Sequence, residues 1–381
     1  MHEKSDMERS IYRIQLWIEE GQYDLALTAL QHIQTYNPEQ ERQIAYFSAW
    51  CHTLLEQWTE ARCLLLHLYP LSSMEENWND AKHNERERRA FYLLCLGNAA
   101  IHLNRYEEAS QHYTQCLKLL SGRRVNLPQV RIKARYSLGM TCIMSGFYVM
   151  AIQHYEEALQ LCKNTSDHED LQEIYFGLCD ANRLLGKFES AYSYGVKSLE
   201  LYEKRGMRTM DGRVQNALGR ICYQMREYNE AADYYLESLS IATLDDNQKT
   251  KLVNFTALAD LRLAEDRLEE AQGYCQCALE VADGLNDNYS LGLMYLTYGK
   301  VTLAESEHIE GEQQKILFSK AIRLFERAKE LLTQTQASVL LGEAYGRIAQ
   351  MLEQSGQPQE AICYWKTAFE SLSMPIGQSL D

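Results

Sequence analysis

The sequence predicts an all-α protein made of stacked helix pairs, and three observations support this prediction. Proline, which interrupts helices, makes up only 5 of the 381 residues. Alanines recur at a spacing of 40 residues over much of the chain. A second small residue usually lies twelve residues before each of these alanines. A repeat of this length, with apolar residues at helical spacing, is typical of a helical solenoid.

The recurring alanine defines one repeat. In the clearest copies it follows an aromatic residue by three positions and precedes another by four, as Ala151 does between Tyr148 and Tyr155. A further small residue, Ala158 in this copy, follows the alanine by seven positions. Nine alanines fit the pattern: Ala26, Ala61, Ala109, Ala151, Ala191, Ala231, Ala271, Ala321 and Ala361. Nine copies make chance a poor explanation.

The residue twelve positions before the alanine is small in most copies and usually follows Leu or Ile. Gly97, Gly139, Cys179, Gly219, Ala259 and Ala349 occupy this position. Small residues let two helices cross closely, while larger ones fill the space between neighbouring pairs. We therefore expect each repeat to form two amphipathic helices joined by a short turn. Since no pair can bury its apolar surface alone, the pairs must stack.

These residues resemble the tetratricopeptide repeat. Two segments match its consensus almost position by position: Leu96-Gly97-Asn98-Ala99 … Tyr106 … Ala109 … Tyr113, and Leu138-Gly139 … Gly146 … Tyr148 … Ala151 … Tyr155 … Ala158. The resemblance is strong over residues 88–372 and weak over 8–69, and it implies a right-handed superhelix of helix-turn-helix units. The common repeat has about 34 residues. The 40-residue period is similar to that of bacterial sensor-regulators of the Rap and maltose-activator types and of animal scaffolds of the Pins type.

Departures from the period divide the chain. Residues 1–70 form either their own N-terminal helical bundle or two degenerate repeats, 71–87 a charged connection, 88–372 seven repeats, and 373–381 a C-terminal tail. Ten extra residues near 304–314 indicate an extended helix with a solvated loop, or else a partner-binding loop. The last repeat carries Trp365 and Phe369 without a polar cap, which solenoid ends normally need. This end therefore predicts contact with a second subunit or another partner.

Composition and motifs exclude several classes of function. The formal net charge of −15 disfavours a nucleic-acid binder, which needs a basic surface. We expect a cytoplasmic protein without membrane contact, because the N-terminus is polar and no apolar run approaches a bilayer span of about 20 residues. Eleven cysteines contain no C-x-x-C pair, so we expect buried free thiols and no bound metal. Glycine-rich phosphate loops and catalytic motifs are missing too, so the sequence predicts neither an enzyme nor a cofactor.

The resemblance implies that the first helix of each repeat lines a concave groove. Counting the small residue of that helix as the eighth, positions 2, 5, 9 and 12 point inward. The predicted peptide-binding residues are Lys133, Tyr136, Phe176, Asp180, Arg183, Arg213, Asn216, Arg220, Tyr223 and Asp260. Amide, guanidinium and aromatic groups together suit an extended peptide. The alternative is a merely hydrated groove, in which opposite charges such as Asp180 and Arg220 pair with each other.

A basic segment interrupts this acidic chain. Six positive charges and no acidic residue lie between Lys118 and Arg135. We expect either a solvated connection or a contact for an anionic peptide or phosphate, made by Arg123, Arg124 and Arg131.

Two functions remain. The first is a non-enzymatic scaffold that binds a protein or peptide segment in its groove. The second, which the resemblance implies, is a peptide-gated regulator of the Rap type that acts on a signalling partner through its N-terminal helical region. Rap phosphatases use a glutamine of that region, and Gln40 and Gln43 lie in the comparable part of this chain without matching a motif.

Overall fold

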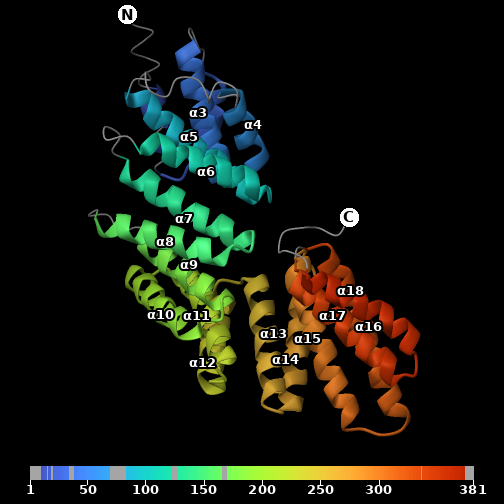
Figure 1. Ribbon diagram of the computed structural model, residues 1–381. Helices are drawn as coiled ribbons and strands as arrows, with labels where there is room; N and C mark the ends of the chain where they lie inside the picture. Colours follow the sequence, from blue (N-terminus) through green and yellow to red (C-terminus); the bar gives the residue numbers. More distant parts are fainter. Residues whose placement is uncertain are drawn as a thin grey trace, which may run out of the picture. The chain divides into compact units, whose positions relative to one another are not determined.

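A computed structural model describes residues 10–14, 16–18, 20–33, 38–68, 83–121, 127–164, 170–335 and 337–373. All regular secondary structure in these ranges is helical, and they contain no strand. Figure 1 shows the helices following one another along the chain. The prediction of an all-α solenoid is therefore confirmed. None of the described helices is both long and apolar enough to span a bilayer.

The chain divides into two compact units, Met1–Asp170 and Leu171–Asp381. Besides helical residues within 10–18, the first unit contains α2 (Tyr23–Gln31), α3 (Pro38–Leu54), α4 (Trp58–Leu68), α5 (His83–His102), α6 (Tyr106–Leu120), α7 (Pro128–Met144) and α8 (Tyr148–Lys163). The second contains α9 (Leu171–Leu184), α10 (Phe188–Arg205), α11 (Arg208–Gln224), α12 (Tyr228–Leu244), α13 (Gln248–Ala264), α14 (Leu268–Ala282), α15 (Asn288–Glu307), α16 (Glu312–Thr333), α17 (Ser338–Gln354) and α18 (Pro358–Ser373).

Consecutive helices pack in pairs, from α5 with α6 to α17 with α18, and these pairs fall where the sequence predicts repeats. Helices α3 and α4 form a further pair, which packs on α5. The predicted boundaries at residues 70 and 87 stay predictions. Residues 71–82 of the charged connection and 374–381 of the tail lie outside the described residues, whereas α5 already begins at His83.

Each hairpin is built around its recurring alanine. All nine alanines have no exposed surface, because the first helix of the pair crosses the second at this point. Where the small residue of the first helix is glycine, it faces the aromatic residue four positions after the alanine. A β-carbon added to Gly219 would lie 2.7 Å from the ring of Tyr235, and one added to Gly299 would lie 2.6 Å from the ring of Phe325. The aromatic ring thus fills the volume that the glycine leaves free.

The turn has the same backbone geometry in the hairpins of regular length. The residue five positions before the alanine has a positive φ, whether it is glycine, as at Gly146 (79°), or not, as at Arg226 (65°). In the longer α15–α16 hairpin the positive φ lies at Gly311 (86°). At the turn between α11 and α12 the Arg226 amide donates to the Tyr223 carbonyl at 3.1 Å, and the Glu227 amide to the Cys222 carbonyl at 2.9 Å. This pair of bonds is the Schellman motif, which ends a helix and reverses the chain.

The ten extra residues near 304–314 lengthen two helices. Helix α15 has 20 residues and α16 has 22, and only residues 308–311 connect them. The extra length therefore extends the hairpin, as an extended helix would, and leaves a short turn in place of a long loop.

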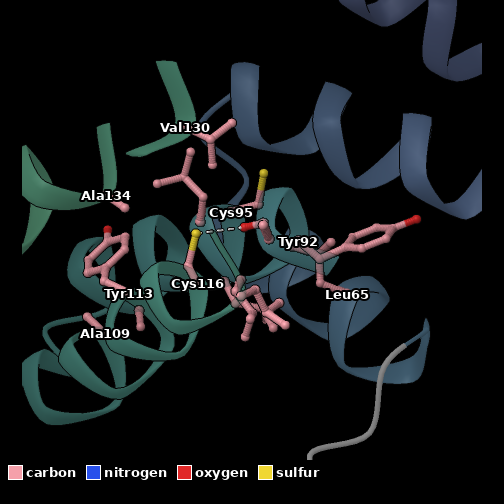
Figure 2. Packing of buried hydrophobic residues seen from close by; sticks show 14 of the residues in the cluster. Leu65, Tyr92, Cys95, Ala109, Tyr113, Cys116, Val130 and Ala134 are labelled. Carbon is pink, nitrogen blue, oxygen red and sulfur yellow. Dashed lines mark hydrogen bonds between the residues drawn. The ribbon is translucent and has the colours of Figure 1, made fainter. Parts of the chain in front are cut away.

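Within each unit, buried side chains of neighbouring hairpins pack in shared clusters. In the first unit, Leu65 of α4 lies in one cluster with Tyr92 of α5, Tyr113 of α6 and Val130 of α7 (Figure 2). The Cys116 thiol in this cluster donates to the Ala90 carbonyl at 3.1 Å. All eleven cysteines are free and eight of them are buried. Burial raises the pKa of the Cys116 thiol to about 12.

The crossing predicts opposite effects for two glycines. Gly219→Ala should lower the free energy of unfolding by about 1–3 kcal/mol, because the added methyl group overlaps the Tyr235 ring. Gly273→Ala is the control: this helical glycine of α14 has open space around its β-position, so alanine should stabilise the helix by about 0.5–1 kcal/mol. Urea unfolding of both variants measures the difference, and equal shifts would contradict the proposed crossing.

The turn predicts a stabilising substitution. Arg226 adopts a left-handed backbone conformation that costs a non-glycine residue about 1–2 kcal/mol. Arg226→Gly should therefore raise the free energy of unfolding by up to about 1 kcal/mol. Gly186→Ala, at the equivalent turn with φ 73° and open space at its β-position, should lower it by a similar amount. Thermal melts compare the two variants, and the idea fails if both shift the midpoint in the same direction.

Candidate functional site

The first helices of the hairpins in the second unit lie side by side. Helix α11 contacts α9 and α13, and α13 contacts α15. We call the surface made by α9, α11, α13, α15 and α17 the A-face. It carries two neighbouring clefts, both lined by side chains of this unit alone.

The first cleft, of about 470 Å³, lies between α9, α11 and the start of α13. It is lined by Phe176, Asp180, Arg183, Arg213, Asn216, Ala217, Arg220, Asn247, Lys249, Thr250 and Val253. The Arg213 guanidinium lies 5.1 Å from the centre of the Phe176 ring, a cation–π contact that holds both side chains. Asn247 caps α13, since its side chain accepts a hydrogen bond from the Thr250 amide at 3.0 Å.

Two of the cations in the first cleft are paired. Asp180 forms an ion pair with Arg183 of its own helix at 2.5 Å, so the pairing of Asp180 with Arg220 considered from the sequence is wrong. Lys249 is paired with Asp287 at 2.6 Å. Among the described residues, no carboxylate lies within ion-pair distance of Arg220. Arg220 is exposed.

The second cleft, of about 220 Å³, lies between α11, α13, α15 and α17. Lys300 lies 2.8 Å from Glu343 and 3.8 Å from Asp260. Burial raises the pKa of Asp260 and Glu343 adds to the effect, while Lys300 opposes it. Burial, together with the Asp260 carboxylate, raises the pKa of Tyr223 to about 12. The Thr297 hydroxyl in the lining is buried and makes no hydrogen bond to the protein.

Three residues line both clefts, namely Asn216, Arg220 and Val253. Asn216 and Arg220 are one turn apart on α11, so their side chains lie on the same side of the helix. The two clefts therefore meet along one helix. The Asn216 amide group also donates to Asn254 Oδ1 at 2.8 Å.

Eight of the ten residues that the sequence predicts for the groove line these clefts. Phe176, Asp180, Arg183 and Arg213 line the first, Tyr223 and Asp260 the second, and Asn216 and Arg220 both. Lys133 and Tyr136 lie on α7 in the other unit, and their part in binding stays a prediction, as does ligand contact by the other eight.

Sequence reasoning missed the contributions of α15 and α17. The second cleft is also lined by Leu293, Thr297 and Lys300 of α15 and by Leu340 and Glu343 of α17. The longer α15–α16 hairpin places Gly299 22 residues before Ala321 instead of twelve, so the register was lost. With Gly299 as the eighth position, the rule gives Leu293 and Lys300 as inward residues.

Two arginines of the basic segment are less available to an anion than the sequence indicates. Arg135 forms an ion pair with Glu157 at 2.8 Å, and Arg131 is half-buried on α7. Arg123 and Arg124 lie outside the described residues. An anion contact at this segment stays a prediction.

One group of residues within the described ranges has donor atoms close enough for a metal ion: Cys222, Glu227 and Glu230, whose ligand atoms lie within 4.8 Å of one another. Metals bind the thiolate form of cysteine. Burial and the neighbouring glutamates raise the pKa of the Cys222 thiol to about 12. The expectation that the chain binds no metal stays a prediction.

The comparisons with known proteins agree with this architecture. Family models described as tetratricopeptide repeats match residues 90–122, 131–204 and 170–244. No curated protein matches the sequence. The matched residues, 90–122 and 131–244, are similar to tetratricopeptide repeats, and they form helical hairpins in the structure.

Solved structures refine this assignment at the level of the fold. The apo form of RapI has a TM-score of 0.68 at 12% identity, with 96% of this chain and 97% of RapI covered. The apo form of the quorum sensor NprR from B. thuringiensis has a TM-score of 0.67 at 13% identity, covering 97% and 99%. A Rap protein complexed with Competence and Sporulation Factor has a TM-score of 0.61 at 12% identity, covering 97% and 98%. The fold is thus that of the Rap and NprR proteins.

The raised pKa of Asp260 predicts a pH effect on stability. A carboxyl group whose pKa is raised on folding stabilises the protein below its unfolded pKa, and that contribution is lost as the pH rises through the folded pKa. As the pH rises from 4 to 7, the melting temperature of Asp260→Asn should therefore increase relative to that of the wild type.

Asp287→Asn serves as the control of opposite sign. Burial opposes the change, yet hydrogen bonds from Lys249 and Ser290 lower the pKa of Asp287. Its contribution is present above the unfolded pKa and is lost as the pH falls. This variant should therefore lose in melting temperature relative to the wild type over the same range. If the melting temperatures of the two variants, measured relative to the wild type, changed with pH in the same direction, the opposite pKa shifts of Asp260 and Asp287 would be contradicted.

Proposed function

We propose that this protein is a non-enzymatic interaction module that binds an extended peptide or partner segment across the two clefts of the A-face. The observation that carries the proposal is the meeting of both clefts at Asn216 and Arg220. These side chains are not needed for the helix crossings, which use alanine, glycine and aromatic residues on other positions.

The chemistry of the clefts fits a peptide. Asn216 offers amide groups for a peptide backbone, and Arg220, which pairs with no carboxylate of the described residues, offers a guanidinium for a carboxylate or a carbonyl oxygen. Phe176, Val253 and Leu293 supply apolar surface for side chains of the ligand. A small set of polar groups on an apolar lining is typical of a specific binding site.

The similar structures favour a regulatory form of this function. One Rap protein is complexed with Competence and Sporulation Factor, and NprR is a quorum sensor. By analogy with them, a ligand held on the A-face would control a signalling partner that contacts the N-terminal helical region. Gln40 and Gln43 lie on α3 of that region, but their side chains are outside the described residues.

A second contact surface lies at the C-terminal helix. Ile362, Trp365 and Phe369 of α18 are 65%, 43% and 72% exposed. In earlier hairpins the position of Trp365 is buried, as at Tyr155 and Tyr235. We assign this apolar stripe to contact with another subunit or partner.

The binding proposal predicts a selective loss of affinity. A phage-displayed library of random heptapeptides, panned on the full chain, should yield a binder. The double variant Asn216→Ala, Arg220→Ala should lower its affinity at least tenfold and remain folded. Its melting temperature should fall by a few degrees, because the buried Asn254 Oδ1 loses the hydrogen bond from Asn216.

The control removes the same residue types from the same hairpin outside the clefts. Arg226 and Asn229 are exposed at the turn between α11 and α12, and replacing both with alanine should leave the affinity unchanged. Unaltered binding by the Asn216 and Arg220 variant would move the site to the basic segment or to α18. Unfolding of that variant would show that the two residues are structural.

A further inference from the structure

One buried polar residue of the second unit departs from the repeat. Counting the small residue of the first helix as the eighth, the third position is apolar and buried in the other repeats from α5 onward. Ala134, Ile174, Val214, Met294 and Ala344 occupy it, with Tyr92 in α5. In α13 the same position holds Asn254, which has no exposed surface. Burying an amide costs free energy unless its groups are hydrogen-bonded.

Asn254 is held by three hydrogen bonds. Its amide nitrogen donates to the Ser238 hydroxyl at 2.8 Å and to the Thr250 carbonyl at 3.0 Å. The Ser238 hydroxyl in turn donates to the Gly212 carbonyl at 2.7 Å. Asn254 Oδ1 accepts the hydrogen bond from Asn216 Nδ2 at 2.8 Å. The chain of bonds joins α12 and α13 to Asn216 of α11, on the A-face.

The direction of these bonds is fixed by chemistry. Backbone carbonyls can only accept, so Thr250 requires the nitrogen of Asn254 on its side, and Gly212 takes the proton of Ser238. Ser198 uses its hydroxyl in the same way, donating to the Gln172 carbonyl at 2.9 Å. The oxygen of Asn254 must then point to Asn216, whose side-chain nitrogen must donate the hydrogen bond. An interchange of nitrogen and oxygen in either amide would set two like groups against each other.

We propose that Asn254 is a positioning residue that fixes the Asn216 amide with its carbonyl oxygen turned to the groove, where it accepts a hydrogen bond from an N–H group of the ligand. The inference rests on the proposed function, since it names the contact that a peptide backbone makes at the junction of the two clefts. Asn216 is half-buried there, and one of its two N–H groups is used by Asn254. The recognised group is a secondary amide, which is common to every peptide bond except one preceding proline.

Two substitutions separate positioning from stability. Asn254→Val restores the apolar residue that the preceding repeat has at Val214, so the melting temperature should be unchanged or higher, while the affinity for the selected heptapeptide falls about tenfold. Asn254→Asp keeps an oxygen facing Asn216 and sets a second oxygen against the Thr250 carbonyl. It should lower the melting temperature and keep the affinity within about twofold. If affinity instead follows stability in both variants, Asn254 is only structural.

A substitution in the ligand tests the hydrogen bond itself. Each backbone amide of the selected heptapeptide is replaced in turn by an ester, which has no N–H group. One ester should weaken binding to the wild type about tenfold and have no effect on Asn216→Ala. A loss that persists in Asn216→Ala, or no sensitive position at all, would overturn the assignment of the acceptor.

A measurement without ligand distinguishes failure of this inference from failure of the proposed function. In the full chain with 15N-labelled asparagine, the Asn216 side-chain amide should exchange slowly with solvent in the wild type and at least tenfold faster in Asn254→Val. Asn182→Leu is the matched control, since buried Asn182 donates only to the Leu178 carbonyl of its own helix, and it should leave Asn216 unchanged. Fast exchange in the wild type refutes the positioning. Slow exchange without any selected peptide keeps the positioning of Asn216 and refutes peptide binding.

Discussion

The close crossing of two helices around one buried alanine is the constraint on which every hairpin depends. It requires a small residue on one helix and a volume on the other that fits it, and the chain meets this requirement in more than one way. Gly219 faces Tyr235, whereas in the preceding repeat Cys179 is the larger partner of Gly195. There Leu218 of the next hairpin fills the remaining space, 2.7 Å from the β-position of Gly195. The repeat therefore conserves packed volume and lets residue identity change.

This constraint leaves part of each first helix free. The crossing uses the small residue and the positions that face the second helix, while the inward positions take no part in it. Residues on the A-face can therefore differ from repeat to repeat without disturbing the core. Asn254 links the core to the A-face in the described clefts, because this buried residue is hydrogen-bonded to Asn216, which occupies an inward position. The inward positions and the positions of the helix crossing are otherwise different residues.

The sequence predicts the hairpins and most of the cleft lining because both follow a fixed period. Ala231 and Gly219 set a register from which Asn216 and Tyr223 follow by counting. Counting fails where the hairpin changes length, so it does not find Leu293 and Lys300 of α15. It also cannot choose between ion-pair partners. Asp180 bonds with Arg183 one turn away, because side-chain rotamers within a helix decide that geometry and the repeat does not.

The free cysteines have a consequence for how the opening of this solenoid can be observed. Cys63 and Cys363 are exposed, one in each unit, whereas Cys51, Cys95, Cys116, Cys142, Cys162, Cys179, Cys222 and Cys275 are buried in successive hairpins. A thiol reagent reaches a buried sulfur only while its helices are locally separated. The buried thiols therefore report on local opening at several points along the chain. The rate at which each sulfur is alkylated gives the free energy of opening of the helices around it.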